Sequence, residues 1–157
     1  MTFESTAPAM WVAAARDIPP VAVPDHSFRI VADAASTGGA YSLTEATSPG
    51  GAGVPPHAHD NAVECFYVLN GTYRLTVSGA THETGPGGFV LVPRGAPHQF
   101  EVLSEDGGRA VVVFAPAGFE SVFRWMPSVF GVPGEPGPIW SWFNAQHGTR
   151  LLDAPGN

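Results

Sequence analysis

The sequence has no lysine and only one cysteine, Cys65, among its 157 residues. A single cysteine cannot form an internal disulfide bond, which excludes a disulfide-stapled scaffold and a zinc site built from several thiolates. The seven basic residues are all arginines and stand against fourteen acidic residues, which gives a net charge of −7. Because nucleic acids and anionic membrane surfaces bind basic patches, we expect neither as a partner.

The chain also lacks a long apolar run. The longest, from Ala110 to Ala115, has the length of one β-strand and is far too short for a membrane span. No basic residue precedes Arg16, and the N-terminal stretch has no separate apolar core, so we expect no signal peptide. A cytoplasmic location is the resulting expectation.

Short segments rich in β-branched and aromatic residues, divided by Gly, Pro, Asn and Ser, predict β-strands. These segments are 28–32, 41–46, 64–69, 73–78, 89–92, 98–103 and 109–115. Strands about ten residues apart with no helix between them indicate an all-β sandwich or barrel. We therefore expect one barrel over residues 26–117, preceded by an N-terminal arm over residues 1–25.

The residues after the barrel change their hydrophobic period. Apolar residues at 119, 122, 123 and 126 form one face of a predicted helix. A second helix is expected over 139–147, which carries Trp140, Trp142 and Phe143. Residues 118–157 therefore predict a helical extension packed on the barrel, and its aromatic side chains either cap a pocket or bury the helices.

Three histidines and a glutamate, His57, His59, Glu64 and His98, have the spacing of a metal site. Residues two apart on a strand point to the same face, so His57 and His59 both face the interior if either does. Imidazoles and a carboxylate suit one divalent transition metal ion (iron, manganese, cobalt, nickel, copper or zinc) better than magnesium or calcium. With the ion bound, the site keeps one net positive charge, which attracts an anionic substrate such as an enolate.

Strand parity also suggests which residues line a substrate pocket. Phe66 shares the face of Glu64, and Phe100 shares the face of His98, so each either lines the pocket or belongs to the barrel core. Tyr41 and Phe89 are further pocket candidates. The remaining histidines, His26, His82 and His147, lack ligand spacing, and we expect His26 and His82 to be solvated.

Two segments resemble the paired motifs of the cupin superfamily. Residues 51–71 follow the pattern G-x5-H-x-H-x4-E-x6-G, and residues 87–98 follow G-x5-P-x-G-x2-H. The wider stretch from 37 to 100 resembles the small single-domain cupins often likened to bacterial quercetin 2,3-dioxygenases. Val102 stands where an Asn, which is not a ligand, often follows the second motif. The resemblance implies a double-stranded β-helix (jelly-roll) barrel, a bound divalent metal and commonly a homodimer.

The same resemblance implies a metal-dependent dioxygenase of quercetinase type. Such an enzyme cleaves or oxygenates a flavonol-like or other enolisable aromatic compound, with dioxygen as the second substrate. Glu64 is then either a plain metal ligand or the general base that takes the substrate hydroxyl proton. Two alternatives stay open: a redox-neutral isomerase or cyclase of secondary metabolism that uses the metal as a Lewis acid, and a non-catalytic protein that binds a small molecule.

Overall fold

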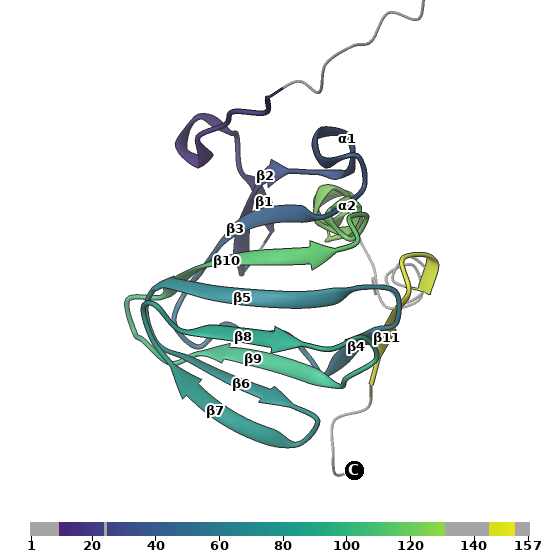
Figure 1. Cartoon of the computed structure of the whole chain (residues 1–157). Helices are drawn as coiled ribbons and strands as arrows, with labels where there is room; N and C mark the ends of the chain where they lie inside the picture. Colours follow the sequence, from purple (N-terminus) through teal and green to yellow (C-terminus); the bar gives the residue numbers. More distant parts are fainter. Residues whose placement is uncertain (1–9, 24, 131–144, 153–157) are drawn as a thin grey trace, which may run out of the picture.

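The strands of the computed structural model, which describes residues 10–23, 25–130 and 145–152, form two antiparallel sheets (Figure 1). The six-stranded sheet has the order β1 (Val21–Val23), β2 (His26–Ala32), β3 (Ser42–Ser48), β10 (Gly108–Ala115), β5 (Val63–Asn70) and β8 (Phe89–Val92). The five-stranded sheet has the order β11 (Thr149–Leu151), β4 (His57–His59), β9 (His98–Val102), β6 (Tyr73–Val77) and β7 (Ala80–Thr84). The prediction of an all-β jelly-roll barrel is confirmed.

Alternating burial along the central strands places one side of each strand inside the barrel. Along β3, every second residue is buried and the residues between are partly or fully exposed, which is the period of two that a strand requires. β5 and β10 follow the same period. The inward positions of these three strands are Ser42, Thr44, Ala46, Ser48, Glu64, Phe66, Val68, Gly108, Ala110, Val112 and Phe114.

Helical segments lie beside β1 and β2, at the top of Figure 1: a 3-10 helix (Ala15–Asp17), α1 (Ala34–Thr37) and α2 (Glu120–Phe130). α2 is the first helix expected after the barrel. Its apolar face packs on the core, where the Phe123 ring stacks on Phe28 at a centroid distance of 4.2 Å. The helix is joined to α1 by the buried carboxylate of Glu120, which accepts a hydrogen bond of 2.9 Å from the Ala34 backbone. Within the described part of the chain, no helix has both the length and the apolar character that a membrane span requires.

The sequence does not predict four of the strands. β1 lies within the expected N-terminal arm but pairs with β2. β4 and β11 have three residues each, and β7 is exposed along almost its whole length, so none of them shows a pattern of alternating burial. The expectation that residues 118–157 are purely helical is corrected by β11, because Thr149–Leu151 joins the five-stranded sheet beside β4. Residues 139–144 of the second expected helix lie outside the described residues.

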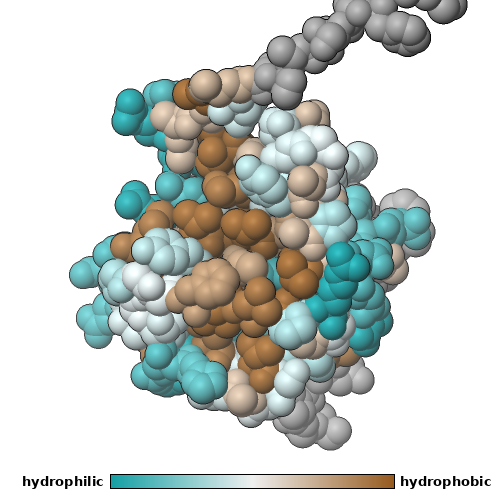
Figure 2. Space-filling model, viewed as in Figure 1, coloured by the Kyte–Doolittle hydropathy of each residue, from teal (hydrophilic) through white to brown (hydrophobic). Residues whose placement is uncertain are grey.

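The outer face of the six-stranded sheet is apolar where β5 and β8 pair (Figure 2). Tyr67, Phe89 and Leu91 are 46%, 61% and 51% exposed there. Tyr67 lies directly opposite Phe89 across the two strands. Figure 2 shows a brown, apolar area over the middle of this face, and an exposed apolar surface of this kind is typical of a contact site.

Candidate metal centre

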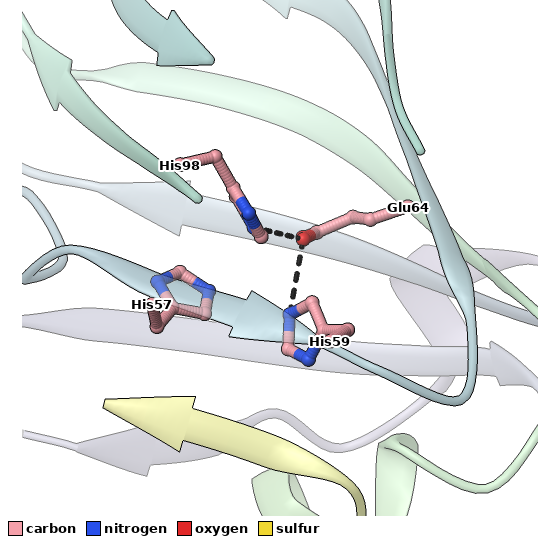
Figure 3. Close-up of side chains that lie close together, drawn as sticks. All are labelled: His57, His59, Glu64 and His98. Atoms are coloured by element: carbon pink, nitrogen blue, oxygen red, sulfur yellow. Dashed lines mark hydrogen bonds and ion pairs between the residues drawn. The ribbon is translucent and has the colours of Figure 1, made fainter. Parts of the chain in front are cut away.

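The four residues singled out by their spacing converge inside the barrel (Figure 3). His57 and His59 come from β4, Glu64 from the start of β5 and His98 from the start of β9. One ligand atom from each residue lies within 4.8 Å of all the others. Glu64, His98 and His59 are buried, with exposed fractions of 5%, 3% and 4%.

Local structure explains this convergence. His57 and His98 are directly paired across β4 and β9, so the two motifs meet at one point of the five-stranded sheet. The second-motif turn is also docked on the first motif, because the Gly95 backbone N–H donates to the His59 carbonyl at 2.8 Å. Gly95 has a φ of 72°, a left-handed conformation that glycine adopts without steric cost. The turn therefore needs glycine at this position to bring His98 to the cluster.

Each of the three imidazole rings is held through its Nδ1 atom. His57 donates from Nδ1 to the Pro55 carbonyl and His98 to the Ala96 carbonyl, each at 2.9 Å. His59 Nδ1 is hydrogen bonded to the Thr149 hydroxyl at 2.9 Å. A carbonyl only accepts, so the proton of His57 and of His98 is fixed on Nδ1 and Nε2 is directed at the cluster. Such outer contacts orient metal-binding histidines in proteins.

The carboxylate of Glu64 stands between two of these imidazoles. Its Oε2 atom accepts a hydrogen bond from His98 Nε2 at 2.7 Å and lies 3.1 Å from His59 Nε2. Burial raises the pKa of Glu64, but the contacts with His59 and His98 outweigh it and lower the pKa to about 2. Burial lowers the pKa of His98, but the hydrogen bond to Glu64, the negative charge of Glu64 and the hydrogen bond to the Ala96 carbonyl together outweigh burial and raise it. Without a metal, the two residues thus form a buried ion pair.

The pKa of His57 is shifted in the opposite direction to that of His98. Burial lowers its pKa to about 4, and the nearby His98 adds to this effect. At neutral pH His57 therefore carries no charge and offers a free Nε2 lone pair.

The cluster fits a divalent transition metal. Metal–ligand bonds of about 2.1 Å place neighbouring ligands about 3 Å apart and opposite ligands about 4.2 Å apart, close to the observed spread. His59 Nε2 is buried, and its contact with Glu64 Oε2 at 3.1 Å lacks the geometry of a hydrogen bond, as expected for an atom that can bind a metal instead. Three nitrogens and one carboxylate oxygen match the preferences of first-row transition metals. His57, His59, Glu64 and His98 would hold the ion.

The cluster opens into an apolar cavity of about 110 Å³ inside the barrel. Of the residues expected in a pocket, Phe66 and Phe100 line this cavity. Tyr41 and Phe89 do not line it, and they are 44% and 61% exposed. Tyr41 has the outward parity of β3, and Phe89 pairs with the outward-facing Tyr67. The prediction that Tyr41 and Phe89 belong to the pocket was therefore wrong.

Sequence reasoning missed several residues of the cavity wall. His26, expected to be solvated, is the first residue of β2, lines the cavity and stacks on Phe28 at 5.8 Å. Its parity with Phe28 is the signal that would have found it. Thr149 of β11 also lines the cavity, but no local pattern marks it, because its role depends on a pairing with His59 far away in the chain.

Comparison with known proteins supports the fold. Residues 44–114 match the family model for the cupin domain. An uncharacterised protein of Streptomyces coelicolor is 41% identical over 61 residues, a match that spans 39% of this chain and only 54% of that relative's length.

Solved structures give the same picture. The polyketide cyclase RemF from Streptomyces resistomycificus is 28% identical with a TM-score of 0.60, covering 68% of this chain and 80% of that one. The ectoine synthase from P. lautus is 19% identical with a TM-score of 0.60, covering 94% of both chains, and shows likeness of fold alone.

Proposed function

We propose that this chain, whose residues 44–114 match the family model for the cupin domain, is a metal-dependent enzyme that acts on an aromatic enol or phenol at its His57–His59–Glu64–His98 cluster. The observation that carries the proposal is the position of this cluster at the wall of an apolar, aromatic-lined cavity. A divalent metal bound there would supply Lewis-acid stabilisation of an enolate or phenolate oxygen.

The protein's own residues provide a setting for such an anion. Phe114 and Phe119 lie against His59, with ring centroids 5.1 and 4.4 Å from the imidazole. These rings exclude water from one side of the cluster, and in a dry site charge–charge attraction is stronger than in solvent. A flat aromatic substrate is also well matched to a wall made of phenylalanine rings.

Two roles are open to Glu64 in this enzyme. It either stays a ligand or accepts the hydroxyl proton of the substrate. With a pKa of about 2 in the metal-free cluster, Glu64 is a weak base while its contacts with His59 and His98 last. Its use as a base therefore requires those two imidazoles to turn their Nε2 atoms to another partner.

The first candidate reaction is a redox-neutral cyclisation or isomerisation. The likeness to the polyketide cyclase RemF, at 28% identity, favours it. In such a reaction an enolate carbon attacks a carbonyl carbon of the same molecule, and the carbonyl oxygen takes up the proton lost in forming the enolate; it then stays as a hydroxyl group or leaves as water. No oxidant is consumed, so the reaction proceeds without dioxygen.

The second candidate is the dioxygenase of quercetinase type that the motif resemblance implies. The intact set of four ligands and the phenylalanines at 66 and 100 that line the cavity favour it. It differs from the first candidate in one measurable respect, because one molecule of dioxygen is consumed for each substrate molecule.

The test begins with metal analysis of protein produced in a medium that contains several transition metals. The loaded protein is then incubated with flavonols and with phenolic polyketide-like ketones, under air and under strict anaerobiosis. Turnover without oxygen supports the cyclase or isomerase, and oxygen uptake supports the dioxygenase. Saturable binding without turnover identifies the third possibility, a binding protein, and contradicts the proposal.

A matched pair of histidine variants controls this experiment. His98→Ala removes a ligand and is expected to abolish both metal content and turnover. His82→Ala changes an exposed histidine on β7 and is expected to leave both unchanged. If the His98→Ala variant still turns over substrate, the proposed function is contradicted.

A further inference from the structure

The cavity has two polar ends. All of its lining residues are apolar except for two groups: one at the metal cluster (His57, His59, Glu64 and Thr149), and one formed by His26, Ser48 and Tyr73. We call the second group the distal triad. Among the described residues, no member of the distal triad is hydrogen bonded to a member of the cluster.

Strand register shows that the distal triad and the cluster lie at opposite ends of the barrel. On β10, Phe114 is paired with Glu64 of the cluster, and Gly108 is paired with Ser48 of the distal triad. Gly108 and Phe114 are six residues apart on an extended strand, which is a distance of roughly 20 Å. Side chains reach inward from both ends, so the free length between the two polar groups is shorter than the distance between these two positions on β10.

His26 and Ser48 form a hydrogen-bonded pair at this end. His26 Nδ1 and the Ser48 hydroxyl are 2.8 Å apart, and His26 Nε2 lies 3.4 Å from the Gly53 carbonyl. A hydroxyl group can donate once and accept twice, so Ser48 keeps unused hydrogen-bonding capacity in either tautomer of His26. Ser48 is only 3% exposed, which leaves little access to bulk water for that capacity.

Tyr73 carries an unused phenol group. Its side chain is 3% exposed, and its hydroxyl makes no hydrogen bond with any other described residue. The phenol lies directly against Gly108, where an added Cβ would come within 2.6 Å of the hydroxyl oxygen. Burial alone raises the pKa of Tyr73 to about 12, so the hydroxyl stays protonated and can donate. Because Tyr73 also lines the cavity, a ligand there can accept the hydrogen bond that this hydroxyl offers.

An aromatic wall joins the two ends. The Phe100 ring lies 5.9 Å from Phe66, 6.0 Å from Tyr73 and 6.0 Å from His26. Phe66 follows Glu64 on the inner face of β5, so the wall runs from the cluster toward the distal triad. A flat ligand that lies along this wall therefore meets the cluster with one edge and the distal triad with the other.

We propose that Tyr73 and the Ser48–His26 pair form a second polar subsite, which binds a hydroxyl or carbonyl group of the substrate remote from the metal cluster. The substrate is then an elongated aromatic compound with oxygen at both ends. The length and polarity of this substrate follow from the cavity, but its binding as an enol or phenol at the cluster rests on the proposed function.

Two hydroxyflavones test this subsite by equilibrium binding to zinc-loaded protein. 3-Hydroxyflavone carries only the enol and ketone of one end, and 3,4′-dihydroxyflavone adds a single hydroxyl at the opposite end. The wild-type protein is expected to bind the second compound about 3- to 10-fold more tightly, the effect of one neutral hydrogen bond in a buried site. Tyr73→Phe is expected to remove this preference and to leave the affinity for 3-hydroxyflavone unchanged.

The controls separate recognition from folding. Tyr67→Phe makes the same change on the outer face of β5, where Tyr67 is 46% exposed, and is expected to keep the preference. Ser48→Ala provides a second variant within the subsite, and it is expected to weaken the preference. Equal affinity of the wild-type protein for the two compounds, or failure to bind either, overturns the subsite. So does a preference that survives both Tyr73→Phe and Ser48→Ala.

A different result would contradict the proposed function. If His98→Ala leaves the affinity for 3-hydroxyflavone unchanged, the cluster does not bind the enol end, and the metal-dependent function loses its support. A preference for 3,4′-dihydroxyflavone that depends on Tyr73 would still establish the second subsite in that case.

Discussion

Thr149 holds the Nδ1 atom of His59 at 2.9 Å, although the two residues are 90 positions apart in the sequence. The contact is made because β11 pairs with β4 and places Thr149 directly opposite His59. The pairing is strengthened at the next position, where Arg150 forms a two-point ion pair with Asp60 at 2.7 and 2.9 Å. A C-terminal strand therefore completes a site whose ligands all lie in the first two-thirds of the chain.

We predict that Thr149→Val weakens metal binding without removing a ligand. Valine keeps the shape of threonine but cannot hold His59 Nδ1, so the ring loses its fixed orientation. Loss of such an outer contact typically lowers metal affinity by about 10- to 100-fold. Competition with a chelating indicator measures the change. Thr47→Val, on the exposed side of β3, is the control, and equal affinities of the two variants would contradict the prediction.

Metal affinity is expected to rise with pH. The hydrogen bond to Glu64 raises the pKa of His98 against the effect of burial, and the proton on His98 Nε2 must leave before that atom can bind a metal. The affinity should therefore increase from about pH 6 to about pH 8, around and above the ordinary histidine pKa of about 6.5. Metal titrations at several pH values measure this slope, and an affinity that is constant over this range would rule out the protonated pair.

The stability of the metal-free protein is expected to fall in acid because of His57. Its pKa is about 4 in the folded protein, below the ordinary histidine value of 6.5, so the folded state resists protonation. The free energy of unfolding is therefore highest above pH 6.5, the pKa of His57 in the unfolded chain. It decreases as the pH falls toward 4, the pKa of His57 in the folded protein. The loss is on the order of 3 kcal/mol between these limits. Denaturant unfolding with a chelator present should show this loss in the wild type but not in His57→Gln.

Gly108→Ala is expected to destabilise the protein by displacing the Tyr73 ring. The backbone of Gly108 is not left-handed, but an added Cβ would lie 2.6 Å from the Tyr73 hydroxyl. Overpacking of this kind costs about 1–3 kcal/mol. Gly85→Ala is the matched control, because its Cβ would meet nothing closer than 3.8 Å. Thermal unfolding compares the two variants, and equal losses would mean that Tyr73 moves aside freely.

The homodimer implied by the family resemblance stays a prediction, and the apolar face of β5 and β8 is where it can be tested. Phe89 and Leu91 are 61% and 51% exposed on that face. If a second copy covers it, replacing both residues by serine should yield a monomer in sedimentation experiments. Val12→Ser, at an exposed apolar position outside this face, should leave the assembly unchanged. A wild-type protein that sediments as a monomer would refute the prediction.

Particular residues show how far the sequence predicts this molecule. The seven expected strands all exist, because each combines β-forming residues with turn residues at its ends. β7 is missed because its residues are almost all exposed and leave no alternating pattern. His26 is misjudged because a neighbouring turn residue signals solvent, whereas its parity with Phe28 places it in the cavity.

The pattern of residues by itself determined the all-β fold and the identity of the four clustered side chains. Both follow from local rules, since strand alternation repeats every two residues and the turn glycines act on their immediate neighbours. Only the tertiary structure decided that Thr149 holds His59, that Tyr41 and Phe89 face outward, and that Tyr73 and Ser48 line the same cavity. These relationships depend on which strands pair and in what register, and pairing between distant segments is fixed by the packing of the whole barrel rather than by any local stretch of sequence.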